Sequence, residues 1–120
     1  MNDYQMGAVE TRFADIIWER EPISSTELCK ISLDTLKWKK STTYTVLKRL
    51  CEKGIFKNEN GIVSSVISKE EFFSVQSTRF VEENFGGSLP AFLAAFTAGK
   101  VLSAEEVAQL RRLVAKHEEV

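Results

Sequence analysis

Basic side chains gather in one short stretch of this chain, between residues 37 and 57. The basic residues there are Lys37, Lys39, Lys40, Lys48, Arg49, Lys53 and Lys57. Glu52 is the single acid among them, which leaves a local charge of +6 in a chain whose formal net charge is −1. A local positive field attracts a polyanion whatever the total charge of the molecule. The chemistry that this stretch can do is therefore ionic binding to phosphate or carboxylate groups.

The same stretch divides between two faces of a helix when residues are placed 100° apart. The apolar face consists of Thr43, Val46, Leu47, Leu50 and Gly54, and the polar face of Ser41, Thr45, Lys48 and Arg49. A helix that is buried on one side and carries cations and short hydroxyls on the other suits a DNA major groove. A solvated basic face without a ligand is the plain alternative.

The candidate DNA contacts fall into two groups. The cations Lys39, Lys40, Lys48, Arg49 and Lys57 are expected on backbone phosphates. The polar side chains Ser41, Thr42, Tyr44 and Thr45 are candidates for base edges or thymine methyls, although some of them will contact only phosphate.

The remaining reactive side chains form no catalytic or metal-binding constellation. Cys29 and Cys51 lack metal-ligand spacing and are expected to be buried as small apolar residues. His117 is the sole histidine and has no clustered ligands beside it. We therefore expect neither enzymatic activity nor a cofactor or metal.

The elements around the basic helix follow from hydrophobic periodicity and turn residues. Helices are expected at about 6–21, from Ser24 to about 31, and at 39–53, with residues 32–37 as a connection and Ile23 extended. Gly54 should end the third helix. Strands are expected at 55–57 and 62–67, joined by turn residues 58–61 that include Asn60-Gly61. Three helices followed by a hairpin make a winged helix-turn-helix.

The second half of the chain predicts three more helices. One runs from the cap Ser68 to about Phe85, one starts at Ser88, and one starts at Ser103. Their apolar side chains exceed what a winged domain can cover, and such a surface indicates an interface. Candidates for dimerisation are Phe72, Phe73, Val75, Phe80, Phe85, Leu89, Phe92, Leu93, Phe96, Val107, Leu110, Leu113 and Val114. The fold class is mainly α with a small β-hairpin: a winged DNA-binding domain over 1–67 and a helical dimerisation domain over 68–120.

The location of the protein also follows from its composition. No apolar run approaches the ~20 residues that span a bilayer. The first ten residues, MNDYQMGAVE, lack the basic start and apolar centre of a secretion signal. We expect a cytoplasmic protein.

From Met6 to about Val114 the sequence resembles the penicillinase and methicillin-resistance repressors, a family of bacterial winged-helix regulators. The resemblance rests on Ile17-Trp18-Glu19, Pro22-Ile23-Ser24, Trp38, Thr42 to Leu50, Lys53-Gly54, residues 67–72, 85–89 and 102–106. It implies a homodimer that binds a palindromic, inverted-repeat operator in double-stranded DNA and represses transcription. In some members a membrane sensor and protease system ends repression.

Four departures from the family pattern affect what can be carried over. Lys39-Lys40 replaces a Ser-Pro pair that starts the recognition helix, so Ser41 becomes an alternative cap that would start the helix later. Ile62 follows Gly61 where the wing commonly has Arg. Ala95-Phe96 stands where some relatives are cleaved at Asn-Phe. The cysteine cluster of copper-responsive relatives is missing.

The leading hypothesis is a homodimeric transcriptional repressor that reads its operator through helix 39–53. The alternatives are a winged-helix module that binds proteins, and a regulator that responds to a small molecule without proteolytic release.

Overall fold

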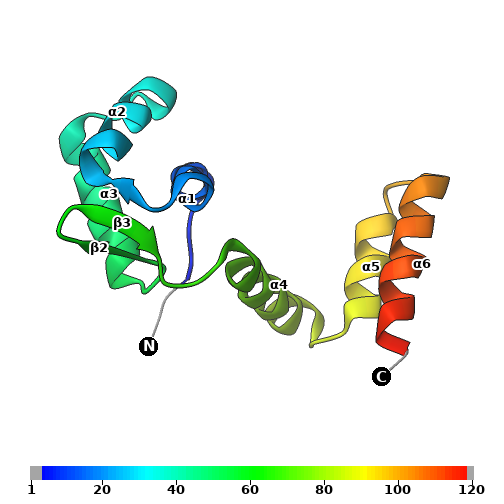
Figure 1. Ribbon diagram of the computed structural model, residues 1–120. Helices are drawn as coiled ribbons and strands as arrows, with labels where there is room; N and C mark the ends of the chain where they lie inside the picture. The colour runs from blue at the N-terminus through cyan, green and yellow to red at the C-terminus, as the bar shows by residue number, and fades with distance from the viewer. Residues whose placement is uncertain (1–3, 119–120) are drawn as a thin grey trace. The chain divides into compact units, whose positions relative to one another are not determined.

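The computed structural model describes residues 4–118 of the chain. Within them lie six helices and one three-stranded antiparallel sheet (Figure 1). The elements are α1 Ala8–Arg20, β1 Ile23–Ser24, α2 Ser25–Leu36, α3 Lys40–Glu52, β2 Phe56–Glu59, β3 Ile62–Ser65, α4 Lys69–Phe85, α5 Leu89–Thr97 and α6 Ala104–Glu118. The chain forms two compact units that divide inside α4, between Thr78 and Arg79. The mainly helical class with a small β-hairpin is confirmed.

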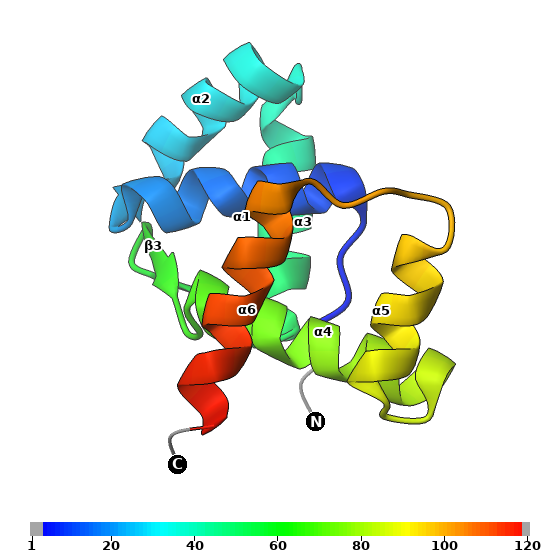
Figure 2. The same ribbon diagram turned by 90° about the vertical axis from the view of Figure 1, so that its right-hand side faces the viewer.

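The first unit is built on the apolar faces of α1, α2 and α3. Its core contains Phe13, Ala14, Ile17, Ile23, Leu28, Val46, Leu47, Leu50, Ile55, Phe56, Val63 and Phe72. Figure 2 shows α1 with α2 and α3 behind and above it. Because each helix supplies apolar residues at helical spacing, the three bury one continuous core between them.

Helix α2 is longer than the sequence predicts. Its start is as expected, since Ser24 Oγ accepts the backbone N–H of Glu27 at 3.1 Å. The connection predicted over residues 32–37 is wrong, because the helix continues to Leu36 and ends at Lys37 in the left-handed conformation, with φ of 60°. Ser32 is fully buried one turn after Leu28, so a small polar residue extends the buried face.

The hairpin of β2 and β3, which we call the wing, closes through a two-residue turn. Asn60 and Gly61 have φ of 54° and 83°, as a type I′ turn requires. Strand β2 runs to Glu59, so the turn is shorter than the four residues predicted. Ile23 is extended, as expected, and it pairs with Val63, which adds β1 to the sheet.

Trp18 connects three parts of the first unit. Its ring centroid lies 5.2 Å from that of Phe56 in β2 and 5.5 Å from that of Phe72 in α4. Its indole N–H donates to the carbonyl of Ile67 at 3.1 Å. Trp38 packs on Phe13 in the same core. Both tryptophans are packing residues, and the first turn of α4 belongs to the winged unit.

The second unit has no buried core of its own within the described residues. Its helices start where predicted, because Ser88 Oγ accepts the N–H of Ala91 and Ser103 Oγ that of Glu106, both at 3.1 Å. Yet none of the described residues of α5 or α6 is buried. The rings of Phe80, Phe85, Phe92 and Phe96 contact one another at centroid distances of 5.5–6.1 Å. The unit therefore presents an apolar surface.

None of the helices in residues 4–118 is both long enough and apolar enough to cross a membrane.

Gly61 offers a test of the wing. A Cβ at this position would lie 3.8 Å from Ser25 Oγ, so space is available, but the φ of 83° is unfavourable for alanine. Gly61→Ala should lower the free energy of unfolding by about 1–2 kcal/mol. Urea unfolding followed by tryptophan fluorescence measures this, because Trp18 and Trp38 both lie in the winged unit.

Gly99→Ala is the matched control, since Gly99 has no such φ and a Cβ added there would meet nothing within 4 Å. Equal midpoints for the Gly61→Ala variant and the unaltered protein would contradict the turn assignment.

Candidate nucleic-acid interface

Helix α3 begins at Lys40, with Lys39 in extended conformation as its N-cap. The N–H of Thr43 donates to the Lys39 carbonyl at 3.0 Å, so the first helical turn includes Ser41. The alternative of a later start capped by Ser41 is therefore wrong. Lys39 makes no side-chain capping bond, as expected from the loss of the Ser-Pro pair.

One face of α3 is locked in the core. Thr43 and Leu50 are fully buried, and Val46 and Leu47 expose 7% and 2% of their surface. The opposite side carries Ser41, Thr45 and Lys48, all exposed, and we call these three residues the outer stripe. The burial fixes the rotation of the helix, so the outer stripe must face away from the core.

Tyr44 lies on one flank of α3 rather than on the outer stripe. Its hydroxyl donates to Ser25 Oγ at 3.1 Å, and the side chain is half-buried. Thr42 is exposed near the start of the helix. Of the four candidates for base edges, Ser41, Thr42 and Thr45 are thus exposed, while the Tyr44 hydroxyl is held against the start of α2.

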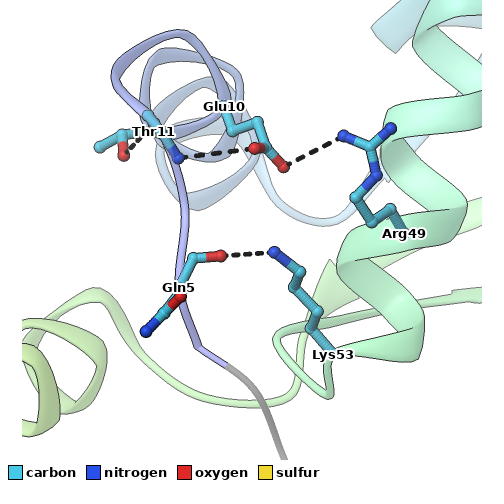
Figure 3. A network of polar contacts seen from close by, with 6 residues as sticks. Gln5, Glu10, Thr11, Arg49 and Lys53 are labelled. Carbon is cyan, nitrogen blue, oxygen red and sulfur yellow. Dashed lines mark hydrogen bonds and ion pairs between the residues drawn. The ribbon is translucent and has the colours of Figure 1, made fainter.

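Arg49 and Lys53 lie on the other flank and meet the N-terminal segment (Figure 3). Arg49 Nη1 is 3.6 Å from Glu10 Oε2, and Lys53 Nζ donates to the carbonyl of Gln5. Glu10 Oε1 also accepts the backbone N–H of Gly7 at 3.5 Å. Glu10 was not among the residues predicted for this site, because nothing in its spacing signals a partner that lies so far along the chain.

The other predicted cations differ in exposure and in the groups that they contact. Lys39 and Lys40 are exposed at the start of α3. Lys57 in the wing pairs with Glu59 at 3.2 Å, so the wing's cation is largely neutralised by its neighbour. Lys37 donates to the carbonyl of Asp34 at 2.9 Å.

The described residues also bear on two other kinds of site, a metal site and a reactive thiol. They contain no cluster of three or more His, Cys, Asp or Glu that could hold a metal. Both cysteines are free and half-buried. Burial, and then the charge of Glu52, raise the pKa of the Cys51 thiol, which disfavours the reactive thiolate.

Comparison with known proteins identifies the family of the chain. Residues 6–116 match the family model described as penicillinase repressor. The chain belongs to the penicillinase repressor family. It is accordingly a DNA-binding transcriptional regulator and not an enzyme. The methicillin resistance regulatory protein MecI of Staphylococcus aureus is 24% identical over 117 residues, covering 94% of this chain and 95% of the relative.

The contact of Tyr44 can be tested by its removal. Tyr44→Phe leaves the Ser25 hydroxyl without this donor and should lower the free energy of unfolding by about 0.5–1.5 kcal/mol. Urea unfolding followed by tryptophan fluorescence measures the change. Lys48→Ala, which alters an exposed residue of the same helix, should shift the free energy by less than about 0.5 kcal/mol. A Tyr44→Phe variant as stable as the unaltered protein would show that the hydrogen bond from Tyr44 to Ser25 contributes nothing to stability.

Proposed function

We propose that this family repressor acts as a homodimer that binds a palindromic operator, with α3 of each subunit in a major groove. The observation that carries the proposal is the outer stripe, which is exposed on a helix whose opposite face is fully engaged in the core. Two such helices related by a twofold axis would read half-sites about one helical turn apart, roughly 34–36 Å. Occupying promoter DNA would then block transcription.

The proposed contacts follow the positions of the side chains. Lys39, Lys40 and Lys48 would neutralise phosphates, and Ser41, Thr42 and Thr45 would face the bases. Arg49 and Lys57 join the phosphate contacts only by leaving Glu10 and Glu59. Tyr44 would contribute its ring edge on the flank, because its hydroxyl is engaged with Ser25.

The wing contributes less to this proposal than α3. Lys57 and Glu59 cancel in charge, and Ile62 near the turn is 47% exposed and apolar. The sequence-independent part of DNA affinity comes mainly from cations on phosphates. The electrostatic contribution should therefore be concentrated on α3.

A salt titration tests the role of α3. Lys48→Ala should weaken binding to an inverted-repeat promoter fragment and lower the slope of log affinity against log salt by about 1. Lys57→Ala should change the slope by less than half as much. Fluorescence anisotropy at several salt concentrations gives both quantities.

Lys116→Ala is the control, because it removes one exposed cation from α6. If Lys48→Ala binds with the same affinity and slope as the Lys116→Ala control, α3 is not the DNA-binding helix.

The second unit supplies the surface for the proposed dimer. Candidate contacts on α5 and α6 are exposed or half-buried apolar residues: Leu89, Phe92, Leu93, Phe96, Val107, Leu110, Leu113 and Val114. Phe73, Val75, Phe80 and Phe85 of α4 are also accessible. Phe72 is left out, because it is 3% exposed in the winged core. In this proposal the second unit, together with accessible residues of α4, holds the subunits together, while residues 1–67 carry the DNA contacts.

Charge placed on the α6 surface should separate the subunits. Leu113 is 56% exposed and lines an apolar groove with Phe92 and Phe96, so Leu113→Glu should leave the subunit folded and weaken dimerisation at least tenfold. Sedimentation over a range of concentrations measures the effect. Ala104→Glu adds the same charge at the exposed start of α6 and should stay dimeric. A Leu113→Glu variant that dimerises like the Ala104→Glu control would rule out this surface.

Release from DNA by cleavage at Ala95-Phe96 would require a local opening. This bond lies inside α5, whose backbone is hydrogen-bonded, and proteases cut chain that has unfolded locally. A cytoplasmic location fits the proposed role, since the operator is in the cytoplasm of a bacterium.

A further inference from the structure

The flank of α3 that faces α1 places a carboxylate beside a predicted DNA contact. Glu10 is the third residue of α1 and points across to Arg49 of α3 (Figure 3). The side chain of Glu10 is 23% exposed and that of Arg49 is 51% exposed, so the pair lies at the rim of the core. At this position the long side chain of Arg49, next to the outer stripe, can turn either inward to Glu10 or outward to DNA.

The carboxylate of Glu10 makes one hydrogen bond to the backbone and one contact with Arg49. One oxygen accepts the N–H of Gly7 at the start of α1, which orients the other oxygen toward Arg49. The chain before α1 is held on both sides, because Lys53 Nζ donates to the Gln5 carbonyl and Gln76 Nε2 donates to the Tyr4 carbonyl at 2.6 Å. The backbone segment that supplies the Gly7 N–H to Glu10 is therefore anchored to α3 and α4.

Arg49 is the more exposed partner of the pair. It directly follows Lys48 of the outer stripe, and half of its side chain surface faces solvent. At 3.6 Å the contact is long for a charge-assisted hydrogen bond, and half-exposed ion pairs exchange easily. A DNA phosphate offers the guanidinium two oxygens in bidentate geometry, which is a stronger match.

We propose that Glu10 sets the affinity of this repressor for DNA by competing with a backbone phosphate for Arg49. This inference rests on the proposed function of α3. In free protein the guanidinium contacts Glu10, and on DNA it must leave this carboxylate, which also repels the incoming phosphate. Glu10 keeps the repressor below the affinity that its cations could reach, which preserves its ability to dissociate.

A double-mutant cycle on the full chain tests the competition. The probe is a labelled mixed-sequence duplex of about 30 base pairs, long enough for two half-sites one turn apart. Glu10→Gln should bind about three- to tenfold more tightly at low salt, with a salt slope larger by about 1, because Arg49 becomes a free phosphate contact. In an Arg49→Ala background the same change should alter affinity less than about twofold.

Glu19→Gln is the matched control for removing one negative charge from the same helix, since Glu19 is exposed near its other end. An equal gain from Glu19→Gln, an equal gain in the Arg49→Ala background, or a loss of affinity in Glu10→Gln would each overturn the proposal. These three outcomes can be told apart from a failure of the proposed function. If α3 does not bind DNA, the unaltered protein will show no salt-dependent binding to the duplex.

A measurement on the unaltered protein covers the case in which Glu10→Gln disturbs α1. The Nε–H resonance of Arg49, assigned by its absence from the Arg49→Ala variant, should shift when the duplex is added. A resonance that is unchanged by saturating DNA would mean that Arg49 stays with Glu10, which also overturns the proposal.

Discussion

The burial of one face of α3 is the constraint on which the rest of the structure depends. Thr43, Val46, Leu47 and Leu50 are packed in the core, and turning the helix would expose several of them. Each large apolar side chain brought into water costs about 1.5–3 kcal/mol, so the rotation of the helix is set by the core. The outward direction of Ser41, Thr45 and Lys48 follows from that packing.

Trp18 extends this constraint to the other elements. Its ring lies between Phe56 and Phe72, and its N–H reaches the Ile67 carbonyl, so α1 holds both the wing and the start of α4. Glu21 adds a polar contact, because its carboxylate accepts the N–H and hydroxyl of Ser65 at 2.8 and 2.7 Å. The wing is therefore held against α1 and its C-terminal end by two independent contacts.

Much of this arrangement is predictable from local signals in the sequence. Ser24, Ser88 and Ser103 each cap the helix that the capping pattern predicts, and Asn60-Gly61 forms the turn. These signals work because each acts within about four residues.

Contacts between distant residues account for what local signals do not predict. Helix α2 extends past Ser32 because a serine can be buried where the core needs a small side chain. Arg49 falls on the polar half of the helix by periodicity, but its contact with Glu10 joins residues 39 positions apart, and Phe72 packs on Trp18 in the winged core. The hydrogen bond from Gln76 to the Tyr4 carbonyl joins positions 72 residues apart. The first unit can therefore make this contact only in a chain that extends into α4, the helix that leads to the second unit. A fragment that ends after the wing would lose this side-chain contact on the segment before α1.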